Sequence, residues 1–292
     1  MSTSNRPLEG KLAIVTGASR GLGSTIARDL ASKGSSIVVN YTSDSSTEKA
    51  SAIVAELKEK YSVKAIPAQA DLGTVDGPEK LISIVKERFS NSEFTVNGKL
   101  QIDIIINNAG IVRPGPIGSV SLDDFQAQYD INVRGPMLVV QAAMPYLPTD
   151  RSGRIINISS VGCSLGFFQE TVYAGTKGAL EAMTKVWARE LAENATVNAV
   201  SVGPIDSGDD GMFLQLPPEM LQKVWAFNKV SALTAVREGV DDERVRKLAD
   251  QLGGRSGYPE EVAGIVGLLC LKEAGWTTGG LIGAHGGMVF GH

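Results

Sequence analysis

Short apolar runs rich in β-branched residues alternate with longer stretches of helical periodicity along most of the chain. The apolar runs predict seven strands: Leu12–Thr16, Ser36–Asn40, Lys64–Gln69, Ile102–Asn107, Arg154–Ser159, Val197–Ser201 and Leu281–Ala284. They are nearly all apolar rather than alternating, which is typical of parallel strands buried on both faces of a sheet. The helical stretches between them are Gly21–Lys33, Thr47–Lys60, Pro78–Phe89, Asp123–Tyr146, Val172–Glu193 and Pro259–Leu271. This alternation predicts an α/β fold, with a doubly wound parallel sheet and helices on both faces.

Two segments depart from the alternation. Ser90–Gln101 is polar and contains the turn signal Asn97-Gly98, so we expect a surface excursion before the fourth strand. Residues 206–254 are longer and mix apolar and aromatic residues with a charged helix. A long segment between sheet elements is often functional, so this one is interpreted as an enlarged substrate lid. Since α/β units often reach roughly 250 residues, residues 1–292 are expected to form a single domain.

Charge and cysteine content exclude several classes of protein. The chain has 28 basic and 32 acidic residues and no long basic run, which argues against nucleic-acid binding. The two cysteines, Cys163 and Cys270, lie far apart in apolar contexts, which predicts neither a disulfide framework nor a metal site. No apolar run reaches the ~18 residues of a membrane span, and the N-terminus lacks the apolar core of a signal peptide. We therefore expect a soluble, cytoplasmic protein with a small-molecule partner.

A glycine-rich turn joins the first predicted strand to the first predicted helix. The turn spans residues 16–23 and has the spacing Gly-x3-Gly-x-Gly. Glycines allow the backbone to approach a diphosphate, and a helix N-terminus offers N–H groups to it. A simple tight turn is the alternative, but the strand–turn–helix context favours a dinucleotide site. The candidate residues in this turn are Gly17, Ser19, Arg20, Gly21, Leu22 and Gly23.

The end of the second strand indicates which dinucleotide is bound. An acidic residue about 20 positions after the first glycine usually binds the adenine ribose, but here Asn40 stands there, followed by the neutral Tyr41, Thr42 and Ser43. A missing carboxylate removes repulsion against a 2′-phosphate, and the Arg20 guanidinium can pair with that phosphate. The sequence therefore predicts NADP(H) rather than NAD(H), unless Arg20 is only a solvated turn residue.

By this point the chain, from Gly10 to Gly287, resembles the short-chain dehydrogenase/reductase family, whose fold is of the Rossmann type. Its motifs follow one another in order: Thr16–Gly23, Asp71-Leu72, Asn108-Ala109-Gly110, Asn132, Ser160 with Tyr173-x3-Lys177, and Gly203–Ser207 with Ile205. The resemblance implies that Asn132, Ser160, Tyr173 and Lys177 are catalytic. It also implies that Asp71, Leu72, Asn108, Ala109, Gly110, Tyr173, Lys177, Ile205 and Ser207 contact the cofactor, as do Asn40, Tyr41 and Ser43. Family members are commonly dimers or tetramers, here through the helices near Asp123–Tyr146 and Val172–Glu193.

Elementary chemistry is consistent with the implied roles. Tyr173 and Lys177 are i and i+4, so they share a helix face, where an ammonium is expected to lower the tyrosine pKa. Ser160 would donate a hydrogen bond to the substrate carbonyl. Asn132 would hold a water that connects Lys177 to solvent. A core tyrosine and a helix-kink asparagine are the structural alternatives for Tyr173 and Asn132.

Substrate identity depends on the lid. Its aromatic residues, among them Phe213, Trp225 and Phe227, favour a bulky, largely apolar ketone over a small sugar. The chain is similar to fungal hydroxynaphthalene and versicolorin-type reductases and to 3-oxoacyl carrier-protein reductases, so an aromatic polyketide is expected. A 3-oxoacyl thioester reductase, a non-redox NADPH-binding protein and a cyclase or isomerase stay open. His285 stands where the family often has aspartate, and we interpret it as a packing or subunit-contact residue rather than a catalytic base or metal ligand.

Overall fold

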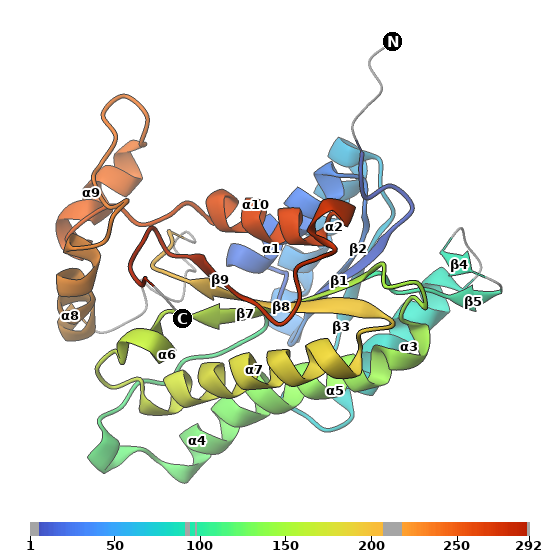
Figure 1. The fold of residues 1–292 in the computed structure, drawn as a ribbon, viewed down its shortest axis with the longest axis horizontal. Coiled ribbons are helices and arrows are strands. Elements are labelled where there is room, and N and C mark those ends of the chain that lie inside the picture. The colour runs from blue at the N-terminus through green and yellow to red at the C-terminus, as the bar shows by residue number, and fades with distance from the viewer. Residues whose placement is uncertain (1–5, 91–93, 97, 207–217, 291–292) are drawn as a thin grey trace.

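The computed structural model describes residues 6–90, 94–96, 98–206 and 218–290. Its centre is a parallel sheet of seven strands in the order β3-β2-β1-β6-β7-β8-β9 (Figure 1). The strands are β1 Leu12–Val15, β2 Ser36–Tyr41, β3 Ala65–Gln69, β6 Ile104–Asn107, β7 Gly153–Ser160, β8 Ala195–Val202 and β9 Leu281–Ala284. These bounds follow the seven predicted runs, so the predicted fold class is confirmed.

Helices cover both faces of the sheet. One face carries α1 (Gly21–Ser32), α2 (Thr47–Tyr61) and α10 (Pro259–Cys270), and the other carries α3 (Gly77–Phe89), α5 (Gly135–Ala143) and α7 (Thr171–Glu190) (Figure 1). Each face has its own buried apolar cluster, with Val15 and Ile26 in one and Ile14 and Leu81 in the other. Because neighbouring residues of a strand enter opposite clusters, the strands read as continuous apolar runs.

The strand order reverses at β1, which fixes where a ligand can bind. β1 pairs with β2 on one side and with β6 on the other, so the loops that follow β1 and β6 diverge to opposite faces. In doubly wound sheets the crevice at such a reversal, at the carboxyl ends of the strands, is the usual binding site. The glycine-rich turn follows β1 directly, at this crevice.

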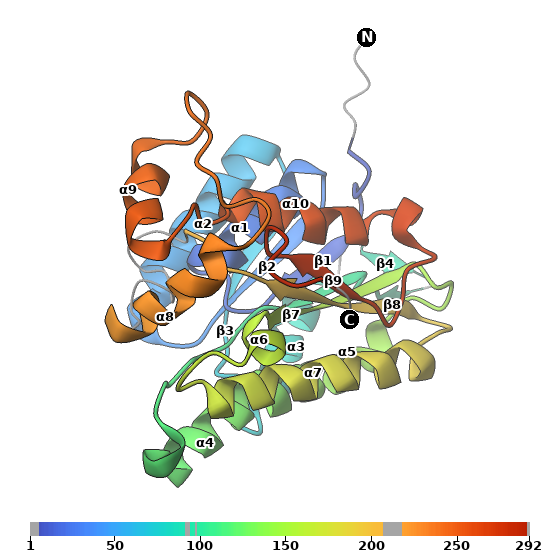
Figure 2. The ribbon, with the colours of Figure 1, turned by 60° about the vertical axis from the view of Figure 1, so that its left-hand side comes forward.

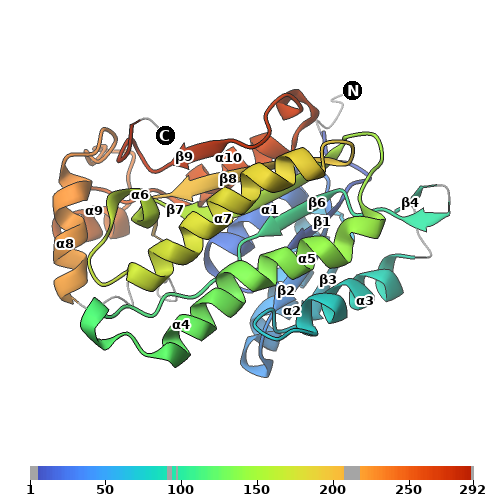
Figure 3. The ribbon, with the colours of Figure 1, turned by 60° about the horizontal axis from the view of Figure 1, so that its bottom comes forward.

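The helix predicted over Asp123–Tyr146 is interrupted. The structure has α4 (Leu122–Tyr129), then a π-helical turn (Asp130–Arg134), then α5, and α7 runs alongside all three (Figure 3). Pro136 lacks an N–H, so it cannot donate to the carbonyl of Asn132 four residues earlier. The local widening accommodates that missing bond, and π-turns are frequent at functional sites. It places Asn132 inside the molecule, fully buried.

Both segments that departed from the alternation add structure outside the sheet. Within 90–101, β4 (Thr95–Val96) and β5 (Lys99–Leu100) form a small antiparallel pair. Within 206–254, α8 (Pro218–Lys229) and α9 (Glu243–Leu252) pack together near the end of the sheet where α6 (Gly162–Leu165) lies (Figure 2). Residues 207–217, including Phe213, lie outside the described residues.

None of the helices in the described ranges combines the length and apolar character that crossing a membrane requires.

A partly buried ion network connects the segments before and after α9 to α10. Asp241 has a fully buried side chain and pairs with Arg237 at 2.6 Å and with Arg255 at 3.4 Å. Arg255 is itself nearly buried and also pairs with Glu261 of α10 at 2.6 Å. Asp241 and Arg255 are the buried centre of this network, whereas Arg237 and Glu261 are about half exposed to solvent.

Replacing Asp241 with asparagine is expected to lower the thermal unfolding midpoint by about 5 °C or more. The amide keeps the size of the side chain but leaves the buried Arg255 guanidinium with less counter-charge. Glu243→Gln is the matched control, because the Glu243–Lys247 pair is about three-quarters exposed at both ends. Thermal unfolding of both variants checks this, and an unchanged midpoint for Asp241→Asn would show that the network adds little stability.

Candidate active site

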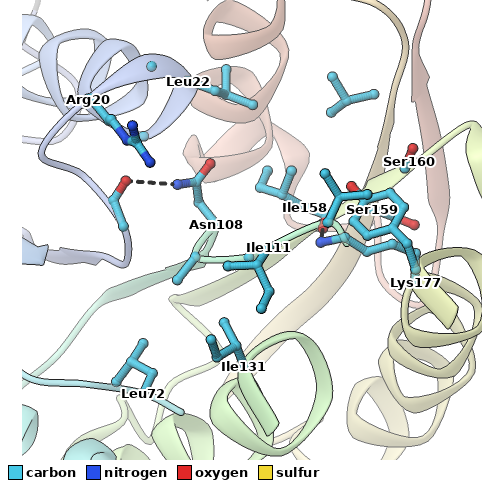
Figure 4. Close-up of a pocket in the computed structure, with 18 of the residues that line it drawn as sticks. Arg20, Leu22, Leu72, Asn108, Ile111, Ile131, Ile158, Ser159, Ser160 and Lys177 are labelled. Carbon is cyan, nitrogen blue, oxygen red and sulfur yellow. Dashed lines mark hydrogen bonds between the residues drawn. The ribbon is translucent and has the colours of Figure 1, made fainter. Parts of the chain in front are cut away.

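A cavity of about 630 Å³ opens at the carboxyl ends of the strands. Arg20 and Leu22 lie at one end of it, and Ser160 and Lys177 lie at the other (Figure 4). Most residues expected to bind a cofactor line this cavity: Gly17, Ser19, Arg20, Gly21, Leu22, Gly23, Tyr41, Ser43, Asp71, Leu72, Asn108, Ala109, Gly110, Tyr173, Lys177 and Ile205. Segments far apart in the sequence thus meet in one elongated site.

The glycine-rich turn packs directly against the loop after β6. Gly17 has a φ of +61°, and a Cβ there would lie 2.9 Å from the Ala109 Cα, so a side chain is excluded. Thr16 Oγ1 accepts hydrogen bonds from the backbone N–H groups of Asn108 and Ala109, both at 2.9 Å. Arg20 is the N-cap of α1 and makes no side-chain capping bond. The N-terminus of α1 therefore faces the cavity with N–H groups suited to a diphosphate.

Asn40 does not line the cavity, although the sequence placed it among the cofactor-binding residues. Its side chain is 1% exposed. Its Oδ1 accepts from the Gly17 N–H at 3.2 Å, and its Nδ2 donates to the carbonyls of Ala68 and Ala70. Asn40 therefore holds the glycine turn from behind. The neutral residues after it, Thr42 and Ser43, line the cavity instead.

Three of the four expected catalytic side chains line the other end. Lys177 Nζ donates to the carbonyl of Ile158 at 2.8 Å and lies 5.6 Å from the centre of the Tyr173 ring. Ser160 hydrogen-bonds with Tyr173, and its Oγ accepts from the Gly162 N–H at 3.1 Å. The preceding Ser159 instead donates to Glu181 Oε1 at 2.5 Å. The structure therefore joins Ser160, and not Ser159, to the tyrosine.

The fourth residue, Asn132, lies behind the cavity wall. Its Oδ1 accepts from the Ile111 N–H at 2.9 Å, and its Nδ2 donates to the Ile111 carbonyl at 2.9 Å. A Cβ on Gly110 would lie 3.2 Å from Asn132 Oδ1 and 3.5 Å from Lys177 Nζ. Asn132 and Lys177 therefore lie close to each other at Gly110, as a proton relay between them requires. The asparagine side chain itself is hydrogen-bonded to the backbone of Ile111.

The pKa values of the pair differ from the sequence-based expectation. Burial raises the pKa of Tyr173, the charge of Glu170 raises it further, and the hydrogen bond from Ser160 lowers it only in part. The expectation that Lys177 lowers the tyrosine pKa is therefore wrong for this structure. Burial also lowers the pKa of Lys177 to about 8, although Cys163 and Glu181 oppose the shift. Tyr173 thus stays protonated at neutral pH, the form that a proton donor needs.

The loop after β8 contributes Gly203, Pro204 and Ile205 to the cavity. Ser207, expected to grip the cofactor there, lies outside the described residues. His285 packs against this loop, since a Cβ on Gly203 would lie 2.8 Å from the His285 Cα. His285 Nδ1 also accepts from the Met288 N–H at 3.2 Å. These contacts agree with the packing interpretation of His285.

Sequence reasoning missed Phe167 and Glu170, which line the substrate end of the cavity. Phe167 packs against Phe227 of α8, with ring centres 5.5 Å apart, so the predicted lid does reach the cavity wall. The other lid aromatic, Trp225, packs instead against Gly253 inside the α8–α9 pair. Glu170 lies one helical turn before Tyr173 on the sequence, and that spacing could have revealed it.

Comparison with known proteins agrees with the family resemblance inferred from the sequence motifs. A family model described as short chain dehydrogenase matches residues 11–238. The chain is 43% identical to an L-xylo-3-hexulose reductase of Hypocrea jecorina, covering 97% of this chain and 98% of the relative. It is also 43% identical to an L-xylulose reductase of Aspergillus niger, covering 98% and 99%.

Polyketide enzymes are among the similar proteins as well. The chain is 35% identical to a versicolorin reductase of Emericella nidulans over 98% of both chains. The solved structure of an angucycline C-6 ketoreductase with bound NADP matches with a TM-score of 0.79 and 28% identity, covering 98% of both chains. The resemblance inferred from the motifs is thereby confirmed.

Proposed function

The chain belongs to the short-chain dehydrogenase family, and from this premise we propose that it reduces a polyhydroxy ketone, a ketose, with Tyr173 as the proton donor. It is an oxidoreductase that acts on carbonyl and alcohol groups and uses NADP(H). The observation that carries the proposal is the meeting of Ser160, Tyr173 and Lys177 at one end of a cavity whose other end is a diphosphate cradle.

The residues present fit NADP(H). Gly17 lies too close to Ala109 to carry a side chain. The backbone N–H groups at the N-terminus of α1 are therefore open to the diphosphate. Arg20 with the hydroxyls of Thr42, Ser43 and Ser46 offers a cation and neutral donors for a 2′-phosphate. When bound, NADPH supplies the hydride.

The protein groups around the carbonyl supply the rest of the chemistry. Ser160 donates a hydrogen bond to the carbonyl oxygen and stabilises the negative charge that develops there. The Tyr173 hydroxyl transfers its proton to the same oxygen, giving the alcohol. Lys177, held by the Ile158 carbonyl, replaces the proton on Tyr173 from the direction of Gly110 and Asn132. The products are the secondary alcohol and NADP⁺.

Two observations support a ketose over the bulky apolar ketone that the lid pattern led us to expect. Both relatives with 43% identity are named for the reduction of sugars. The cavity also contains a buried carboxyl group, that of Glu170, beside Tyr173. A site for a purely apolar substrate has no use for such a group.

An aromatic polyketide ketone is the second candidate. The substrate end also contains Val112, Pro114, Val161 and Phe167, and Phe227 of the lid lies behind Phe167. This apolar wall suits a flat ring system, and a versicolorin reductase is among the relatives of the chain. NADPH consumption with L-xylulose, a naphthoquinone, a naphthol and a 3-oxoacyl thioester distinguishes the candidates. Turnover fastest on L-xylulose supports the ketose; turnover fastest on an aromatic compound or a thioester refutes it.

Arg20→Ala is expected to raise the KM for NADPH roughly tenfold or more and to leave that for NADH nearly unchanged. The guanidinium faces the end of the cavity where the 2′-phosphate would lie, and NADH has no such phosphate. Steady-state kinetics with both cofactors checks this, with Arg20→Lys as the charge-preserving control. Equal losses for both cofactors would mean that Arg20 only shapes the turn.

The rate of ketone reduction is expected to fall as the pH rises above about 8. Lys177, with its pKa lowered to about 8, then loses the positive charge needed to return a proton to Tyr173. A pH profile of kcat/KM checks this. In Lys177→Arg the guanidinium stays charged, so the falling alkaline limb of the profile should move to higher pH even though the overall rate is lower. A limb that stays near pH 8 in the arginine variant would exclude Lys177 as its source.

We also propose that the chain is a single domain and that it assembles into a homo-oligomer. Two apolar clusters on opposite faces of one sheet support a single reductase domain, with residues 206–254 as its lid. Exposed apolar side chains on α4, α5 and α7 support a homodimer or homotetramer through these helices. They are Leu122, Phe125, Met137 and Val186, which are 85%, 43%, 40% and 52% exposed. Light scattering of the purified protein tests that assembly.

A further inference from the structure

Glu170 is a buried carboxyl group at the substrate end of the cavity, and the mechanism above does not use it. It is the N-cap residue of α7, is 6% exposed, and makes no side-chain capping bond. Its chain position, one turn before Tyr173, places it on the same side of α7 as the tyrosine. Its charge raises the pKa of Tyr173, which shows that the two groups lie near each other.

The carboxyl group also lies beside the serine that binds the carbonyl. The position that a Cβ on Gly162 would take is 2.7 Å from Glu170 Oε2 and 3.3 Å from Ser160 Oγ. The two oxygens are therefore neighbours across Gly162. A substrate whose carbonyl oxygen is held by Ser160 and Tyr173 therefore has Glu170 close to its reacting end.

Nothing in the described part of the protein offers a hydrogen bond to this carboxyl group. Ser160 Oγ accepts from Gly162, and Cys163 donates to Glu181 and to the Ser160 carbonyl. Burying a carboxyl group without a partner is costly, and burial raises its pKa to about 7. A group kept in a binding cavity at that cost, with its oxygens open to the cavity, is suited to a polar part of the substrate.

We propose that Glu170 selects α-hydroxy ketones by forming a hydrogen bond with the hydroxyl group on the carbon next to the reacting carbonyl. The inference rests on the proposed ketose reduction and deepens it. A ketose supplies that hydroxyl, and its binding satisfies the buried carboxyl group. An aromatic ketone without the hydroxyl leaves the carboxyl group desolvated, so the same residue disfavours it.

Glu170→Leu and Glu170→Gln, assayed on L-xylulose and on the apolar ketone α-tetralone, test the inference. Leucine removes the hydrogen bond, so kcat/KM on L-xylulose should fall about 10–100-fold, mainly through KM. On α-tetralone the same variant should gain activity, because an apolar side chain then faces an apolar substrate. Glutamine keeps the size and the hydrogen-bonding capacity, so it should retain at least about a tenth of the wild-type kcat/KM on L-xylulose.

The possible outcomes separate this inference from the proposed function. Reduction of L-xylulose that is undiminished in Glu170→Leu overturns the role of Glu170 alone. The inference is also overturned if the leucine variant loses kcat/KM equally on both substrates, binds NADPH more weakly, or has a lower thermal unfolding midpoint. Each of these results would show that Glu170 has a structural role. Wild-type protein that reduces α-tetralone but no α-hydroxy ketone overturns the proposed function and this inference together.

Discussion

Replacing Tyr173 with phenylalanine is expected to lower kcat for ketone reduction by about 10²–10⁴-fold and to leave NADPH affinity nearly unchanged. The ring stays in place beside Lys177, but the proton that must reach the carbonyl oxygen is gone. The pKa of Tyr173 is raised by burial, so in the wild type that proton is present throughout the neutral range.

Single-turnover and steady-state NADPH oxidation measure this loss, and NADPH fluorescence titration measures the affinity. Tyr129→Phe is the matched control. The Tyr129 hydroxyl lies 3.1 Å from the position of a Cβ on Gly175, against α7 and outside the cavity lining. Its loss should change kcat little. Full turnover by Tyr173→Phe would remove the tyrosine from the mechanism.

Replacing Ser160 with alanine is expected to lower kcat by about 10²–10³-fold. In the proposed mechanism its hydroxyl group donates to the carbonyl oxygen, where negative charge develops in the transition state. The loss should therefore appear in kcat more than in KM. Steady-state kinetics on the best ketone of the substrate panel measures both parameters.

The adjacent serine provides a control for Ser160→Ala in the same strand. Ser159 donates to Glu181 at 2.5 Å, away from the tyrosine, so Ser159→Ala should cost far less activity than Ser160→Ala. Equal losses in the two variants would mean that the strand end matters for packing and not for the carbonyl. A larger loss in Ser159→Ala would reverse the assignment of the catalytic serine.

Periodicity and motif order were enough to predict the sheet and most of the cavity. Each apolar run became a strand because its residues enter apolar clusters on both faces, as Ile14 and Val15 do. The interruption before α5 could not be read from periodicity, because Pro136 acts on a carbonyl four residues earlier while the apolar pattern continues. Boundaries of this kind depend on single backbone hydrogen bonds.

Asn40 and Glu170 show where sequence reasoning about a site ends. Asn40 occupies the predicted position along the chain, but its amide turns inward to Gly17, Ala68 and Ala70. Only the three-dimensional arrangement shows which way a side chain at the end of a strand points. Glu170 belongs to no motif; its spacing from Tyr173 indicates only that it lies near the tyrosine, and its burial and its position across Gly162 from Ser160 are visible only in the structure. The expected lowering of the Tyr173 pKa failed because burial and the charge of Glu170 both raise that pKa, and the hydrogen bond from Ser160 opposes them only in part.

Product analysis of the reaction with L-xylulose and NADPH tests the central claim most directly. We predict that one NADPH is oxidised for each molecule of pentitol formed. In Tyr173→Phe this reaction should be almost completely lost. The claim is contradicted if the protein binds NADPH but oxidises none of it with any ketose, or if NADPH is oxidised without formation of the alcohol.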